Sequence, residues 1–200
     1  AWGPRPVDFH LKGLEKLGAK ITLESGYILA EADRLIGADI TFEFPSVGAT
    51  GNLAMAAVTA DGTTILDNAA CEPEITQLCE YLNLMGANIS GIGTNRLVIQ
   101  GVDELQEADI DIIPDRIEAG TFLAAGALLG EITLNNVNPG HLYTVIEKFK
   151  EAGCNIHTSS DSITISKAEL INSVDMTTAV YPGFPTDLQA QWVAFMTLAN

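Results

Sequence analysis

The sequence predicts an α/β fold (α+β in some classifications) made of repeated units, with helices in the middle and sheets outside. Three observations lead to this prediction: an internal repeat, helical segments that are apolar nearly all round, and short strands between them. A helix without a polar face belongs in the centre of a domain. The predicted unit runs β-α-β-α-β-β and inverts the doubly wound arrangement, in which the sheet is central.

The internal repeat is marked by glycines at positions 18, 86 and 153, each of which follows a helical segment and precedes a strand. The matching segments are 14–21, 82–89 and 149–156, and a second pair, 62–66 and 130–134, keeps the same spacing. Two sets of matches in one register indicate stacked copies of one unit. Glycine at the end of each helix suits a left-handed cap.

The pattern assigns a helix or strand to most of each unit. Apolar helices are expected over residues 52–60, 121–129 and 191–199, and further helices over 73–85 and 139–152, each with proline in its first turn. Strands are expected over 38–44, 63–66, 96–100 and 109–113. Proline at position 114 ends the last strand, at either a domain boundary or an ordinary loop.

Composition restricts the function classes. With 47% hydrophobic and 18% charged residues the chain is globular, and its net charge of −16 argues against non-specific nucleic-acid binding. No apolar run approaches the roughly 20 residues of a membrane span. Three cysteines without a CxxC pair predict buried thiols in a reducing compartment, and no metal cluster or cofactor motif is found. We therefore expect a cytoplasmic protein without metal, cofactor or membrane contact.

A turn over residues 44–50 is the first candidate binding element. Ser46 can cap the helix that follows, and Gly48 lets a ligand approach the backbone closely. Free N–H groups and the positive end of the helix dipole suit a phosphate there. A helix cap without any ligand is the alternative. If the apolar helices run parallel and begin at one end, their dipoles would converge on an anion despite the net charge.

Two other segments carry candidate chemistry. Residues 5–10 place Arg5, Asp8 and His10 around a rigid proline, which suits a phosphate or carboxylate ligand, or equally a surface loop with an Arg–Asp pair and a packing histidine. Asp187 precedes the third apolar helix, where it could be a general base or only a partner of the helix dipole. Asp115, Arg116 and Glu118 hold comparable positions before the second apolar helix.

Four segments together resemble successive signatures of the enolpyruvyl transferase family, specifically its UDP-N-acetylglucosamine branch rather than its shikimate-phosphate branch. They are Arg5-Pro6-Val7-Asp8, Ser46-Val47-Gly48-Ala49-Thr50, the run from Pro114 to Phe122, and Phe184-Pro185-Thr186-Asp187. The resemblance implies two domains of three units each. Residues 1–113 would form part of the catalytic, UDP-sugar-binding domain and residues 114–200 part of the second domain.

The resemblance also implies a reaction and its residues. The family branch transfers the enolpyruvyl group of phosphoenolpyruvate to the 3′-hydroxyl of UDP-N-acetylglucosamine, releasing phosphate, in the first committed step of peptidoglycan synthesis. Asp187 would be the catalytic base, and Asp115 and Glu118 would line the cleft. The substrate-binding residues would be Arg5, Pro6, Val7, Asp8, Phe9, Phe44, Pro45, Ser46, Val47, Gly48 and Asp187. Phe44 stands where some members carry lysine.

Departures from the family pattern shape the remaining expectations. The proton-donating cysteine or aspartate of the family would directly precede Ala1, so none of Cys71, Cys79 and Cys154 is given that role. We therefore expect a piece of a longer chain that shows no turnover alone and that self-associates through uncovered apolar surface. The alternatives are a 3-phosphoshikimate 1-carboxyvinyltransferase and a noncatalytic repeat protein such as a clamp.

Overall fold

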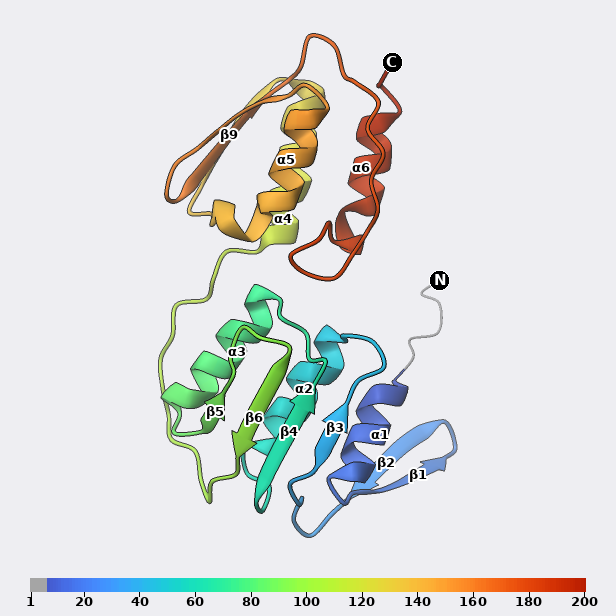
Figure 1. Ribbon diagram of the computed structural model, residues 1–200, viewed down its shortest axis with the longest axis vertical. Helices are drawn as coiled ribbons and strands as arrows, with labels where there is room; N and C mark the ends of the chain where they lie inside the picture. The colour runs from blue at the N-terminus through green and yellow to red at the C-terminus, as the bar shows by residue number, and fades with distance from the viewer. Residues whose placement is uncertain (1–6) are drawn as a thin grey trace. The chain divides into compact units, whose positions relative to one another are not determined.

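The computed structural model describes residues 7–200, which belong to two compact units (Figure 1). The first unit extends to Ile112 and the second runs from Ile113 to Asn200. The division lies beside the boundary expected at Pro114. The assignment of each unit to a functional domain stays a prediction.

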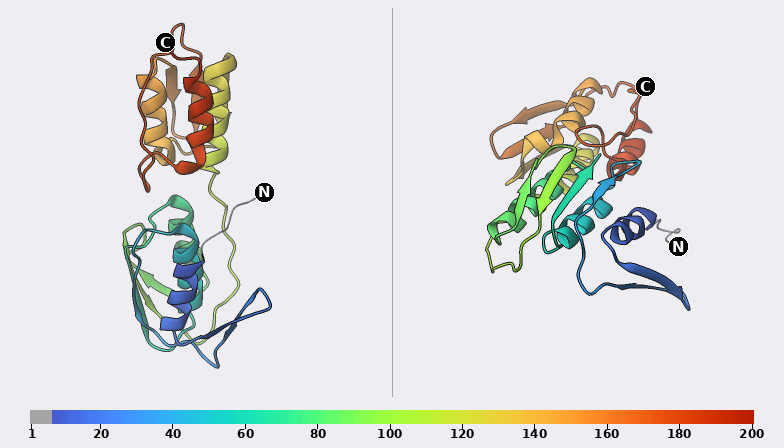
Figure 2. Two further views of the ribbon diagram at one scale, coloured as in Figure 1. Left: turned by 90° about the vertical axis from the view of Figure 1, so that its right-hand side faces the viewer. Right: turned by 60° about the horizontal axis from the view of Figure 1, so that its bottom comes forward.

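The first unit contains one full copy of the predicted repeat. Its elements are α1 (Asp8–Lys16), β1 (Lys20–Glu24), β2 (Tyr27–Glu31), β3 (Asp39–Thr41), α2 (Val47–Ala57), β4 (Thr63–Asp67), α3 (Pro73–Leu84), β5 (Asn88–Ser90) and β6 (Arg96–Gln100). From β3 to β6 they follow the order β-α-β-α-β-β, which confirms the predicted unit. The sheet order is β3-β4-β6-β5, with β3 parallel to β4, and the helices lie on one side of this sheet (Figure 2).

The second unit repeats the pattern without its first strand. Its elements are α4 (Arg116–Leu129), β7 (Glu131–Asn135), the 3-10 helix η1 (Pro139–Leu142), α5 (Tyr143–Glu151), β8 (Asn155–Thr158), β9 (Ser162–Ser166), the 3-10 helix η2 (Thr186–Leu188) and α6 (Gln189–Met196). The three strands form an antiparallel sheet in the order β7-β9-β8. The helices again pack beside the sheet.

The prediction of a strand over residues 109–113 is wrong. This segment has no regular structure and lies along α3, where its backbone carbonyls bind side chains instead of a neighbouring strand. The amide Nε2 of Gln77 donates to the carbonyl of Asp111 at 2.8 Å, and the Tyr81 hydroxyl donates to the carbonyl of Ala108 at 3.2 Å. Alternation of apolar residues alone was therefore not sufficient evidence for a strand, since Ile112 is 79% exposed here.

Helix ends agree with the predicted caps, but the apolar helices begin earlier than predicted. Helix α2 begins at Val47 because the Ser46 hydroxyl accepts a hydrogen bond from the N–H of Ala49 at 3.3 Å, which confirms the predicted N-cap. In α4 an Asp115 carboxylate oxygen accepts from the N–H groups of Ile117 and Glu118, at 2.7 and 3.1 Å. The glycines at 18, 86 and 153 have φ of 92°, 100° and 99°, as left-handed caps require.

The apolar helices each have a buried and an exposed side. One side of each faces a core, but Met55 of α2, Phe122 of α4 and Val193 of α6 are 48%, 47% and 56% exposed. A sheet covers one side of each helix bundle and neighbouring helices cover another, which leaves a third side open among the described residues. The predicted arrangement, with core-facing helices and sheets outside them, is confirmed.

Two of the three cysteines are buried, as predicted, and Cys71 is half-buried. Burial, together with the nearby carboxylate of Glu80, raises the pKa of the Cys79 thiol to about 11. Burial also raises the pKa of Cys71 and Cys154. All three side chains therefore stay protonated at neutral pH and are poor nucleophiles.

Replacement of Asp115 by alanine should lower the free energy of unfolding by about 1 kcal/mol, because two backbone N–H groups of α4 lose their acceptor. Asp115→Asn should keep most of that stability, since its side-chain oxygen can still cap the helix. Urea unfolding followed by the fluorescence of Trp192, which is buried in the same unit, measures both variants. Equal losses in the two variants would show that charge, not capping, is what Asp115 contributes.

Replacement of Gly13 by alanine should destabilise the first unit by about 1–3 kcal/mol, because the added methyl would overlap the side chain of Leu53 on α2. This loss should exceed the helix-propensity gain of alanine over glycine, about 1 kcal/mol. Thermal unfolding by circular dichroism tests it, with the exposed Glu15→Ala on the same helix as control. A Gly13→Ala protein as stable as the wild type would show that the two helices can move apart freely.

Candidate functional site

In the first unit the three helices run parallel and begin at the same end. Near the beginning of α1, His10 Nδ1 lies 3.0 Å from the side-chain nitrogen of Asn52 on α2. The Thr50 hydroxyl of α2 accepts from the N–H of Ala70, in the loop before α3, at 3.0 Å. The positive ends of the helix dipoles of α1, α2 and α3 therefore lie near one another.

The turn before α2 presents two free backbone donors at this end of the unit. The Ser46 hydroxyl caps Ala49, and the N–H of Thr50 bonds to the Ser46 carbonyl. Within residues 7–200 the N–H groups of Val47 and Gly48 have no acceptor, as is normal for the first helical positions. Both residues are exposed, while most of α2 beyond them is buried. This arrangement can bind an anion such as a phosphate.

Aromatic and charged side chains surround the turn. The side chain of Phe44 is uncharged and 60% exposed. Lys12 Nζ lies 3.6 Å from the Glu43 carboxylate, so its charge is partly neutralised. The rings of Phe9 and Phe42 meet edge to face, with centroids 6.2 Å apart, which fixes the beginning of α1 against the segment leading to the turn.

The predicted N-terminal site residues are only partly described. Arg5 and Pro6 lie outside the described residues. Val7 and Asp8 are exposed at the beginning of α1, where the Asp8 carboxylate also complements the helix dipole. Because the His10 ring lies against Gly48, the structure brings this helix end and the turn over residues 44–48 together.

The predicted residues of the second unit also lie at helix beginnings. Asp187 is exposed in η2, directly before α6. The Gln191 side chain of α6 donates to the Thr121 hydroxyl of α4 at 2.9 Å, so these two helices also begin side by side. Asp115 is engaged in capping, and the Arg116 guanidinium lies over the Tyr181 ring at 5.6 Å from its centroid. Glu118 is exposed.

Sequence analysis missed one polar residue at this site. Asn52 is half-buried in α2, and its amide contacts the imidazole of His10, for which a ligand role and a packing role had both been left open. The sequence did contain a signal for a polar contact at this position, because Asn52 carries an amide side chain within a helix made otherwise of apolar and small residues. Its partner could not be found, because 42 residues separate the two.

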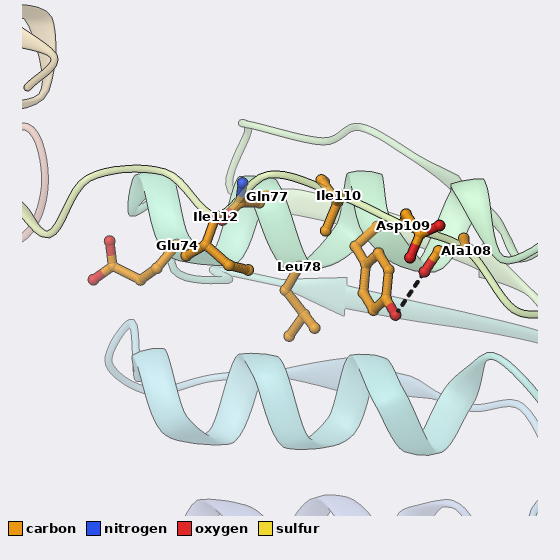
Figure 3. Close-up of a pocket in the computed structure, with 8 residues that line it drawn as sticks. Glu74, Gln77, Leu78, Ala108, Asp109, Ile110 and Ile112 are labelled. Carbon is orange, nitrogen blue, oxygen red and sulfur yellow. Dashed lines mark hydrogen bonds between the residues drawn. The ribbon is translucent and has the colours of Figure 1, made fainter. Parts of the chain in front are cut away.

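A pocket of about 430 Å³ lies elsewhere in the first unit, between α3 and residues 108–112 (Figure 3). Tyr81 and Ala108, which are joined by a hydrogen bond, both line it. The carboxylates of Glu74 and Asp109 line it, together with apolar side chains. Negative charge disfavours an anionic ligand, and none of the predicted site residues line this pocket.

Across residues 7–200, none of the helices has the length and apolar character that a membrane span needs. Nor do three or more His, Cys, Asp or Glu side chains gather in this part of the chain in a way that could hold a metal ion.

Curated relatives match the whole chain. UDP-N-acetylglucosamine 1-carboxyvinyltransferase of Chloroherpeton thalassium is 57% identical over 203 aligned residues, covering 100% of this chain and 47% of the relative. Proteins of the same name from Chlorobaculum parvum and Desulfosudis oleivorans are 54% and 52% identical, and the match covers 48% of each. The chain thus spans about half the length of these relatives.

Solved structures share the fold. The enolpyruvyl transferase NikO from Streptomyces tendae matches with a TM-score of 0.86 and 23% identity, covering 98% of this chain and 50% of that one. EPSP synthase from Acinetobacter baumannii matches with a TM-score of 0.60 and 24% identity, covering 86% of this chain and 42% of that one. The family model described as EPSP synthase (3-phosphoshikimate 1-carboxyvinyltransferase) matches residues 1–200. The chain therefore belongs to the EPSP synthase family, whose members are enolpyruvyl (carboxyvinyl) transferases.

Proposed function

We propose that this chain supplies the nucleotide-sugar-binding part of a UDP-N-acetylglucosamine 1-carboxyvinyltransferase. The reaction would move the enolpyruvyl group of phosphoenolpyruvate to the 3′-hydroxyl of UDP-N-acetylglucosamine and release phosphate. The observation that carries the proposal is the 57% identity, over the full chain, to a relative of that name. Peptidoglycan precursor synthesis in the cytoplasm is the process that this reaction would serve.

The turn before α2 would bind the diphosphate of the nucleotide. The N–H groups of Val47 and Gly48 would donate to phosphate oxygens, and the adjacent helix dipoles would add positive potential. A chain with a net charge of −16 can hold an anion there because the local field, not the total charge, acts on the ligand. Arg5, Asp8 and the exposed Phe44 would contact other parts of the UDP-sugar.

Asp187 would be the general base of the reaction. It would accept the proton of the 3′-hydroxyl, whose oxygen then attacks C2 of phosphoenolpyruvate while C3 takes up a proton from a general acid, giving a tetrahedral ketal. Loss of a proton from C3 together with phosphate would then restore the double bond and complete the transfer. The exposed position of Asp187 at the beginning of α6 is compatible with this role.

A second candidate within the same chemistry is 3-phosphoshikimate 1-carboxyvinyltransferase. The name of the matching family model favours it. We rank it lower because the curated relatives at 50–57% identity carry the UDP-N-acetylglucosamine name. A noncatalytic repeat protein would keep the repeated units but bind neither substrate.

The chain should be stabilised against heat by UDP-N-acetylglucosamine and not by shikimate 3-phosphate, since a ligand that binds only the folded state raises the unfolding temperature. Thermal shift and titration calorimetry with the 200-residue chain measure both. Stabilisation by shikimate 3-phosphate alone would favour the second candidate. Stabilisation by neither would contradict the proposed substrate.

Replacing Val47 by proline tests the role of the turn directly. Proline removes one N–H donor and is tolerated at the first helical position, and Ser46 has the extended backbone that a residue before proline requires. Loss of a hydrogen bond to a charged group should weaken UDP-N-acetylglucosamine binding about 10- to 100-fold. Val47→Ala, which keeps the N–H, is the matched control and should bind normally. Equal affinities in the two variants would exclude this N–H from the site.

A further inference from the structure

We propose that His10 is an additional ligand-binding residue of this site, which donates a hydrogen bond from Nε2 to the diphosphate, and that Asn52 is the positioning residue that holds it ready. This inference rests on the proposed function and adds a side-chain donor to the backbone donors of the turn. It uses two residues from separate helices, α1 and α2.

The contact between His10 and Asn52 determines where the imidazole carries its proton. Asn52 Nδ2 lies 3.0 Å from His10 Nδ1. A side-chain amide nitrogen is only a donor, so Nδ1 must be the acceptor in this pair. The neutral ring then carries its hydrogen on Nε2, because one ring nitrogen of a neutral imidazole donates when the other accepts.

The donor nitrogen lies beside the turn before α2. A Cβ atom built on Gly48 would be 3.4 Å from His10 Nε2 and 3.5 Å from Cε1, so this edge of the ring lies against the first turn of the helix. Asn52 is one turn further along α2 and holds the other nitrogen. The Nε2–H of His10 and the free N–H groups of Val47 and Gly48 therefore occur at one helix end.

The N–H donors of His10, Val47 and Gly48 suit a phosphate group as ligand. Val47 and Gly48 are exposed, whereas His10 and Asn52 are half-buried, so the ring is held firmly next to an accessible turn. Three N–H donors on neutral groups can share the oxygens of one diphosphate. A Cβ atom at position 48 would reach van der Waals contact with the ring, so the two groups are direct neighbours.

The first measurement is the tautomer of His10 by nitrogen-15 NMR of the 200-residue chain. The sequence contains three histidines, so the His10 signals are assigned by their loss in His10→Phe. We expect a neutral imidazole with hydrogen on Nε2 in the wild type. Asn52→Leu should lose this single tautomer, because Nδ1 no longer has its donor. A wild-type ring with hydrogen on Nδ1 would overturn the proposal.

The second measurement is binding of uridine, UDP and UDP-N-acetylglucosamine by calorimetry. His10→Phe should weaken UDP and UDP-N-acetylglucosamine about tenfold or more and leave uridine unchanged, because only the diphosphate contacts Nε2. His10→Gln, whose amide can replace the donor, should recover much of the affinity, and the exposed His157→Phe is the matched control. Equal loss for uridine and UDP would show a merely structural role and overturn the inference.

The outcomes separate this inference from the proposed function. If the wild type binds UDP-N-acetylglucosamine and His10→Phe binds it equally well, the ligand role of His10 is wrong while the proposed function stands. If the wild type binds neither UDP nor UDP-N-acetylglucosamine although His10 has the expected tautomer, the proposed function fails and the ligand role fails with it.

Discussion

Close contact between parallel helices, made through glycine, determines most of what this molecule can do. Gly13 of α1 faces Leu53 of α2 with no room for a methyl group, and in the second unit Gly120 of α4 faces Leu188 in the same way. Small residues allow the helices to pack side by side with their beginnings aligned. Without this contact neither His10 nor the turn at Gly48 would lie where they do.

Aligned helix beginnings give an acidic chain a place for an anion. A net charge of −16 would repel a diphosphate if charge were spread evenly over the surface. Backbone N–H groups at helix beginnings are a fixed source of positive potential that needs no basic side chain. The pocket beside residues 108–112 shows the contrast, since carboxylates of Glu74 and Asp109 border it.

The repeat accounts for the sheets as well as the helices. The unit from β3 to β6 forms a four-stranded sheet. The β1–β2 hairpin belongs to another copy of the unit, and the described residues include only the last helix and the last two strands of that copy. Its strands pair only with each other there, and Leu23 and Tyr27 are 76% and 72% exposed. A two-stranded ribbon is marginally stable by itself, so this hairpin depends on α1 for support.

The sequence by itself determined the repeated unit, the order of its elements, the glycine caps and the Ser46 cap, because these depend on local backbone preferences and on the period of the apolar residues. It also indicated the family through short motifs. Only the tertiary structure decided that the segment around residues 108–112 accepts hydrogen bonds from side chains of α3 instead of forming a strand, because those partners come from residues far apart in the chain. The pairing of His10 with Asn52 could likewise not be predicted from the sequence, because it depends on the separation and rotation of two helices. Packing around Gly13, and not spacing in the chain, sets that geometry.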